Sequence, residues 1–349
     1  DLGKRKGALR YDLTVPLARV VSQYKYQLPL PFKRYQIQNV FRADKPQKGR
    51  YREITQCDID IVGSSSPLAD AEIVALIEKC LIRLGFTEFT IRINSRQVLF
   101  AVMEQAGVPK DKVLSVIQSI DKLDKKTREE VEAELTTKGV TSKIIKQVFS
   151  SLEKARPDKY LQEVINSLSE LNVRKSSWKF DPTLARGLDY YTGPIFETVV
   201  TKPKIGSITG GGRYDQLLNL LGGTDLPAVG TTIGLDRVVD VILDQNLWAD
   251  SILTPTQILV SVFDASLKKY SLEIVNELRD QGLKTELYLN YQDKLSDQLK
   301  YADKKGIQYV ILAGQDEYKN KKITVKNLKT GEQQISTINE LVEILKENI

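Results

Sequence analysis

The sequence predicts an α+β protein of two or three domains. Three observations predict it: two strand-like segments joined by a loop near the N-terminus, a long helical stretch in the middle, and alternating strands and helices at the C-terminal end. The 349 residues are 41% hydrophobic and 28% charged, which is typical of a globular protein. No run approaches the roughly 18 apolar residues of a membrane span, and the charged segment 1–10 lacks the apolar core of a signal peptide.

The N-terminal part is expected to pair two antiparallel strands, 33–43 and 52–63, because β-branched and aromatic residues partly alternate in both. The segment between them contains Pro46 and Gly49 and is too long for a two-residue turn, so it is expected to be a loop. We expect a helix at 68–84, a strand at 89–94 and a helix at 96–106 to follow. These elements complete the first part of a domain, at residues 1–107.

The middle of the chain, residues 108–174, is helical in pattern and dense in Lys and Glu, which predicts a helical insertion. Strand signals return after it, and the glycines at 210–212 are expected to break the chain. The expected elements in the second part of the domain, 175–250, are strands at 178–180 and 195–201, an apolar run at 229–235 and a helix at 238–243.

The C-terminal part follows a linker at 251–256 and alternates strands with helices, which predicts a small, mostly parallel α/β domain at 255–349. Its strands are expected at 257–263, 284–289, 308–312 and 322–327, and its helices at 267–281, 294–305 and 338–347.

Composition limits the chemistry. The chain has no histidine, which excludes imidazole acid–base catalysis and histidine-ligated metals, so Arg, Lys, Asp, Glu, Tyr or a substrate group must carry any reaction. Two cysteines, Cys57 and Cys80, are too few for a disulfide framework or a cysteine-based zinc site and fit a reducing cytoplasm. A net charge of +6 suits a polyanionic partner, although a merely basic protein explains it equally well.

Two arginines are candidates for binding phosphate. Arg42 ends the first strand, where it is held more rigidly than on a loop, and Arg50 lies in the loop that follows. A rigid guanidinium can bind a phosphate through two hydrogen bonds while a second one closes over it. A solvated basic hairpin is the alternative.

Gln56, Asp58 and Asp60 alternate along the second strand and therefore share one face. Burying an amide and two carboxylates is costly unless they bind something polar. A solvent-facing sheet is the alternative, with Cys57 and Ile59 on the opposite face toward a core.

Three later segments are further candidates. Residues 184–193 (LARGLDYYTG) place Arg, Asp and two Tyr among glycines, and residues 210–215 (GGGRYD) allow a backbone to approach a ligand closely. Arg237 stands at the start of an apolar helix. The alternatives are an ordinary polar loop, a plain turn and a surface arginine.

Together these segments resemble the histidyl-tRNA synthetase family in its eukaryote-like form, over nearly the whole chain. The resemblance rests on LRYDLTVP (9–16), FRADKPQKGRYRE (41–53), QCDIDIVG (56–63), LARGLDYYTG (184–193), GGGRYD (210–215) and GTTIGLDR (230–237). It implies a class II synthetase core, an antiparallel sheet flanked by helices, formed by 1–107 and 175–250. It also implies the helical insertion at 108–174 and an α/β anticodon-binding domain at 255–349.

The resemblance also implies roles for particular residues. Arg42 and Arg237, assisted by Arg50, would hold the phosphates of ATP, which binds with Mg²⁺, and Arg186 would lie against the α-phosphate and the histidine carboxylate. No metal site made by the protein alone is expected. The histidine-binding residues would be Asp12, Thr14 and Gln56 at the amino group, Asp60 and Tyr191 at the imidazole, and Tyr214 lining the pocket.

The implied activity is that of a histidine–tRNA ligase: histidine and ATP form histidyl-adenylate, and histidine then passes to its tRNA. The alternatives are a catalytically inactive regulatory subunit of histidine biosynthesis and a sensor of uncharged tRNA. The resemblance further implies a cytoplasmic homodimer that does not enter the membrane. Because the chain starts at Asp1, has Met103 as its one methionine and lacks the family's motif 1, we expect a fragment with an incomplete dimer interface and poor activity.

Overall fold

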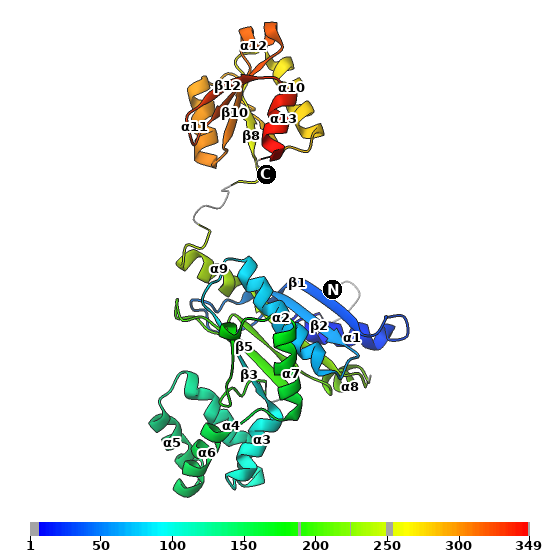
Figure 1. Cartoon of the computed structure of the whole chain (residues 1–349), viewed down its shortest axis with the longest axis vertical. Helices are drawn as coiled ribbons and strands as arrows, with labels where there is room; N and C mark the ends of the chain where they lie inside the picture. The colour runs from blue at the N-terminus through cyan, green and yellow to red at the C-terminus, as the bar shows by residue number, and fades with distance from the viewer. Residues whose placement is uncertain (1–6, 188–189, 224, 249–253, 348–349) are drawn as a thin grey trace. The chain divides into compact units, whose positions relative to one another are not determined.

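The protein divides into two compact units, at residues 1–248 and 249–349. The computed structural model describes residues 7–187, 190–223, 225–248 and 254–347 (Figure 1). Within these residues, no helix is long and apolar enough to cross a membrane.

The first unit is built on a seven-stranded sheet in the order β1-β2-β7-β6-β5-β3-β4. Every neighbouring pair is antiparallel except β3 and β4, which confirms the predicted antiparallel core. The strands are β1 (Phe32–Phe41), β2 (Glu53–Val62), β3 (Thr90–Ser95), β4 (Trp178–Phe180), β5 (Pro194–Val199), β6 (Thr209–Arg213) and β7 (Ala228–Gly234).

The glycines at 210–212 do not break the chain, contrary to the sequence prediction. They form β6, in the middle of the sheet. A side chain at Gly211 would lie 2.6 Å from the Cα of Thr231 on β7, so only glycine fits this close approach. Glycine is a weak strand former, but β5 and β7 pair with β6 on either side and supply the backbone hydrogen bonds that hold it extended.

Helices cover one face of the sheet, where Ile59 and Ile61 of β2 join a buried cluster with side chains of α2 and α9. Helix α2 begins after Ser66, whose hydroxyl accepts a hydrogen bond from the Leu68 N–H at 3.2 Å, and α7 packs against α2 (Figure 1). The helices of this unit are α1 (Thr14–Tyr24), α2 (Pro67–Arg83), α3 (Arg96–Gln105), α4 (Val113–Ile120), α5 (Arg128–Thr137), α6 (Ser142–Lys154), α7 (Lys159–Glu170), α8 (Leu217–Gly222) and α9 (Leu235–Asp244).

Helices α3, α4, α5 and α6 bury an apolar cluster of their own, with Met103, Ile117, Leu135 and Val148 among its members. Leu161 of α7 belongs instead to the cluster beneath the sheet. The limits of the helical insertion, 108 and 174, stay predictions.

The second unit has a five-stranded sheet in the order β12-β11-β10-β8-β9. The prediction of a mostly parallel sheet is wrong, because β8, β9 and β10 are parallel whereas β11 and β12 run antiparallel to their neighbours. A parallel return needs a long crossover, and the connections 313–322 and 328–332 are too short for one.

The second unit also has its own buried core, which contains Ile258, Ile274 and Ile311. Its elements are β8 (Ile258–Val260), α10 (Lys268–Asp280), β9 (Thr285–Leu287), α11 (Leu295–Lys305), β10 (Tyr309–Leu312), α12 (Gln315–Asn320), β11 (Ile323–Asn327), β12 (Gln333–Ser336) and α13 (Ile338–Glu347).

Candidate active site

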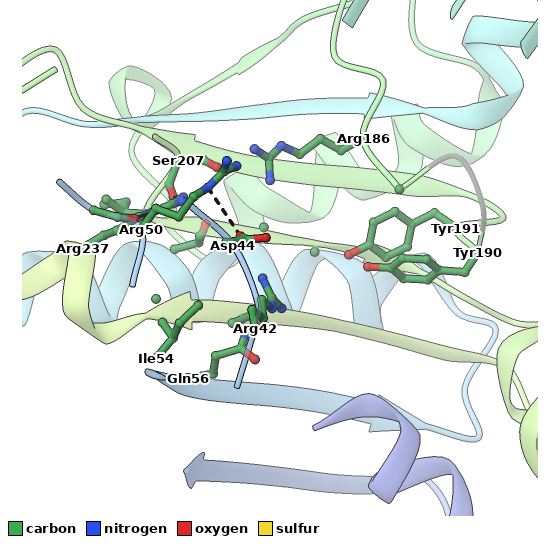
Figure 2. Close-up of a pocket in the computed structure, with 18 residues that line it drawn as sticks. Arg42, Asp44, Arg50, Ile54, Gln56, Arg186, Tyr190, Tyr191, Ser207 and Arg237 are labelled. Atoms are coloured by element: carbon green, nitrogen blue, oxygen red, sulfur yellow. Dashed lines mark hydrogen bonds and ion pairs between the residues drawn. The ribbon is translucent and has the colours of Figure 1, made fainter. Parts of the chain in front are cut away.

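A cavity of about 310 Å³ opens on the face of the sheet that carries Gln56 of β2. Four arginines from separate parts of the chain line it: Arg42 after β1, Arg50 in the β1–β2 loop, Arg186 in the segment before β5, and Arg237 on α9 (Figure 2). The structure therefore brings together all four arginines that the sequence singled out. Asp44 is the acidic residue among the described residues that line this cavity.

Backbone carbonyls hold two of these arginines. Arg237 donates from Nε to the Gly49 carbonyl at 2.7 Å and from Nη1 to the Ser207 carbonyl at 2.6 Å. Arg42 donates from Nε to the Tyr11 carbonyl at 3.4 Å and lies over the Tyr11 ring, 4.7 Å from its centroid. No ion pair involves Arg42 or Arg237 among the described residues. Both positive charges therefore remain available to an anion.

The Arg237 guanidinium lies in an unfavourable environment for a cation. Burial lowers its pKa, and the positive charges of Arg186, Arg50 and Arg42 lower it further. Arg50 is partly compensated, since its Nε lies 3.6 Å from Asp44 Oδ2. An anionic group in the cavity would relieve this repulsion, and a polyphosphate matches a cluster of several guanidiniums.

Arg186 is oriented by a buried carboxylate that the sequence analysis missed. Its Nε lies 2.5 Å from Glu197 Oε1 on β5, and Arg92 lies 3.1 Å from the other oxygen of that carboxylate. Arg92 is itself paired with Asp181 at 2.8 Å. Residues 188 and 189, and with them the Asp of the 184–193 segment, lie outside the described residues.

The polar face of β2 is buried, so the alternative of a solvent-facing sheet is wrong. Gln56, Asp58 and Asp60 are 9%, 4% and 4% exposed. Asp58 accepts a hydrogen bond from the Thr232 hydroxyl at 2.6 Å, and burial raises the pKa of its carboxyl to about 6. Gln56 Oε1 has no hydrogen-bond partner among the described residues, and Gln56 lines the arginine-rich cavity, where a ligand can supply a donor.

A second, smaller cavity of about 50 Å³ adjoins the first, because Tyr190, Tyr191, Gly210 and Thr232 line both. Figure 2 shows Tyr190 and Tyr191 side by side, with ring centroids 4.2 Å apart. The smaller cavity is also lined by Thr14, Asp58, Asp60, Tyr214, Gly230 and Thr231. It can take a small polar group bearing N–H donors, since two carboxylates reach it.

Asp12 is the one predicted site residue that lines neither cavity. Its Oδ1 accepts a hydrogen bond from the Val15 N–H at 3.1 Å and so holds the start of α1, which carries Thr14. Its charge still raises the pKa of Asp58, so the two carboxylates lie close enough to interact.

Arg213 and Tyr214 of the 210–215 segment face opposite sides of the sheet. Arg213 pairs with the buried Asp70 of α2, on the helical face. The Tyr214 hydroxyl donates to Asp60 Oδ1 at the smaller cavity. Of these two contacts, only the one between Tyr214 and Asp60 lies at the candidate site.

Asp60 has a further partner that the sequence analysis did not single out. Arg34 lies directly opposite it on β1, with Nη2 2.8 Å from Asp60 Oδ2. The available signal was the alternation of Arg34, Gln36 and Gln38, which mirrors that of Asp60, Asp58 and Gln56. Within the described residues, no group of three or more acidic or cysteine side chains could hold a metal ion.

Comparisons with known proteins agree with this geometry. The family model described as histidyl-tRNA synthetase matches residues 1–238, and the model described as an anticodon binding domain matches residues 257–348. The chain is 39% identical to a histidine–tRNA ligase of Christiangramia forsetii, over 97% of this chain and 79% of the relative. It is 41% identical to one of Gloeobacter violaceus, over 94% and 79%.

Solved structures match over similar lengths. The crystal structure of histidyl-tRNA synthetase from Nostoc sp. PCC 7120 matches with a TM-score of 0.88 and 30% identity, over 98% of this chain and 84% of that chain. The antiparallel sheet, the arginine-lined cavity and the anticodon-binding unit together define a class II aminoacyl-tRNA synthetase. Within that class, the chain belongs to the histidyl-tRNA synthetase family.

Proposed function

We propose that this chain activates histidine with ATP and transfers the histidyl group to its tRNA. The observation that carries the proposal is the pair of adjoining cavities, one lined by four arginines and the other by two carboxylates and three tyrosines. The first suits a triphosphate, and the second suits a small molecule with N–H donors.

In the first step, a carboxylate oxygen of histidine attacks the α-phosphorus of ATP, and the bond to pyrophosphate breaks. Arg42, Arg50 and Arg237 would bind the phosphates, and Arg186 would neutralise the charge that collects around the α-phosphate. In the second step, the terminal adenosine hydroxyl of the tRNA attacks the histidyl carbonyl, and AMP leaves. The protein contributes positioning and charge stabilisation, neither of which needs a histidine side chain.

The substrate histidine would lie with its ring in the smaller cavity. Asp60 and Tyr191 would contact the imidazole, and Tyr214 would close the pocket beside them. The unpartnered Gln56 Oε1 and the Thr14 hydroxyl would receive the amino group. Asp12 would act on that group through its charge and by holding the start of α1.

Mg²⁺ would enter with ATP. Asp44 lines the cavity with a side chain that is 41% exposed, and it would bind Mg²⁺ together with the phosphate oxygens of ATP. One or two carboxylates and substrate phosphates are the usual ligands of this ion. When bound, the ion neutralises phosphate charge.

The partners follow from the same proposal. The second unit would bind the anticodon of the tRNA. A cytoplasmic location is supported by the two free cysteines. A homodimer is supported by the edge strand β1, on which Tyr35 and Ile37 are 76% and 57% exposed. Sedimentation at several concentrations tests the dimer.

Histidine-dependent ATP–pyrophosphate exchange, followed by charging of histidine tRNA, tests the activity. Exchange that requires histidine and no other amino acid is expected. Histidine binding without exchange would indicate the regulatory subunit, and tRNA binding without exchange would indicate the sensor. Neither alternative is favoured by the site, because all four phosphate-binding arginines are present.

A further inference from the structure

We propose that Arg34 of β1, which lines neither cavity, is a positioning residue that determines how tightly the site binds the histidine ring. The inference rests on the proposed function, because it assigns the ring to Asp60. Arg34 is proposed to fix the Asp60 carboxylate in one orientation and in its ionised form, so that it accepts a hydrogen bond from a ring N–H.

Asp60 is held from two sides. Arg34 Nη2 forms an ion pair with Oδ2 at 2.8 Å, and the two side chains are only 10% and 6% exposed; Oδ2 still lacks a hydrogen-bond partner among the described residues and can accept one from a ligand. The Tyr214 hydroxyl donates to Oδ1. Gly230 of β7 leaves space for this carboxylate, since an added Cβ would lie 2.8 Å from Asp60 Cγ. The carboxylate therefore has little freedom to turn.

Arg34 also joins parts of the site that are distant in sequence. Its Nη2 donates to the Leu13 carbonyl at 3.1 Å, and its Nη1 donates to Gln36 Oε1 at 2.6 Å. Leu13 immediately precedes Thr14, which lines the smaller cavity. One guanidinium thus links β1, β2 and the start of α1. A lysine would keep the charge but could not make these contacts at once.

The charge of Arg34 opposes protonation of Asp60. Burial raises the pKa of this carboxyl, and the opposing influence of Arg34 is the largest that lowers it, ahead of the Tyr214 hydrogen bond. Other titratable groups near Asp60 include Asp58, whose pKa is raised by the Asp60 charge, and Tyr191, whose raised pKa keeps it neutral below the alkaline range. Without Arg34, a protonated carboxyl would become favourable. Such a group would present an O–H donor where the ring N–H needs an acceptor.

The test measures the KM of histidine and of ATP in pyrophosphate exchange between pH 5.5 and 8.5, for the wild type, Arg34→Lys and Arg34→Leu. Both variants should raise the KM of histidine by about 10-fold or more, because the hydrogen bond from the ring N–H to the charged Asp60 is weakened or lost. The KM of ATP should change less than about two-fold. In Arg34→Leu, the pH below which histidine binding weakens should move upward. Titration of histidine itself is common to all variants and cancels in this comparison.

Lys33→Gln is the matched control, because Lys33 is the neighbouring cation on the opposite face of β1 and pairs with the exposed Glu72. It should leave both KM values and the pH profile unchanged. The Arg34→Leu, Asp60→Asn double variant should be about as impaired as Asp60→Asn alone, because Arg34 acts through Asp60.

The outcomes separate the inference from the proposed function. If the wild type shows no histidine-dependent exchange, the proposed function is wrong. If the wild type is active but both Arg34 variants raise the KM of ATP and of histidine equally, Arg34 has only a structural role. The same conclusion follows if the effects of Arg34→Leu and Asp60→Asn are additive. If Arg34→Leu does not fold, Arg34→Lys and the Lys33→Gln control decide: an unchanged histidine KM in Arg34→Lys overturns the inference.

Discussion

Replacing Arg186 with alanine should slow formation of the adenylate far more than it destabilises the protein. Arg186 lines the arginine-rich cavity with a side chain that is 40% exposed, while its Nε is fixed by Glu197 at 2.5 Å. Attack of a carboxylate on a phosphate brings two anions together. A preorganised guanidinium at this point stabilises the charge that develops in the transition state.

The size of each effect follows from these contacts. Losing one preorganised donor costs about 10²–10³ in rate, or about 2.7–4 kcal/mol. Leaving a buried carboxylate unpaired costs about 3–5 kcal/mol of stability, but Glu197 keeps its second partner, Arg92, at 3.1 Å. We therefore expect a loss of stability of only about 1 kcal/mol. Arg186→Lys should also be impaired, because it keeps the charge without the planar fork.

Arg174→Ala is the matched control. Arg174 is 46% exposed and its Nε lies 3.1 Å from Glu78 Oε1, a carboxylate as buried as Glu197, but it lies outside the cavity. Glu78 also keeps a second partner, the Ser177 hydroxyl at 2.6 Å. The two variants should therefore lose similar stability in a melting curve, while only Arg186→Ala slows single-turnover adenylation.

The result that would refute this reasoning is an Arg186→Ala protein with a lower melting temperature and a near wild-type adenylation rate per folded molecule. Arg186 would then only brace its loop. Equal slowing in Arg174→Ala would refute it too, because the loss would then reflect general destabilisation.

Four further predictions concern the site and the second unit. Asp60→Ala should raise the KM of histidine by about 10-fold or more, since the ring loses a charged acceptor; an unchanged KM in exchange kinetics would rule out that role. Gly211→Ala should destabilise the protein by several kcal/mol, because its Cβ would lie 2.6 Å from the Cα of Thr231 in the adjacent strand; denaturant unfolding measures this. Asp58 has a raised pKa of about 6, so the native protein holds an extra proton and loses stability as pH rises from about 4 to about 6. Asp58→Asn should flatten that slope, and an unchanged slope would contradict the burial argument. Deleting residues 255–349 should spare exchange but weaken tRNA charging, because this unit has its own core; equal charging by both forms would disprove the role.

Local patterns allowed much of the fold to be predicted. The pairing of β1 with β2 followed from alternating residues, and the shared face of Gln56, Asp58 and Asp60 followed from strand geometry. The family resemblance then assigned the arginines that the fold brings to one cavity. These inferences depend only on neighbours in sequence or on motifs with a characteristic order.

The remainder depends on register and on contacts between distant segments. Glu197 could not be recognised as the partner of Arg92, because helices α3 to α7 separate β3 from β5 in the sequence. Strand β6 was missed because glycine is a weak strand former, and only its position between β5 and β7 makes it extended. Strand β12 was missed because it is polar and mostly exposed.

The unbalanced guanidinium cluster has an evolutionary consequence. Mutual repulsion among Arg42, Arg50, Arg186 and Arg237 opposes folding, and the backbone carbonyls that hold Arg237 carry no negative charge to offset it. A duplicated copy relieved of nucleotide chemistry would gain stability from a substitution that removed Arg42 or Arg237, which have no carboxylate partner among the described residues, so drift would erase the cluster. Selection for the proposed role in holding a polyphosphate would instead keep the set complete.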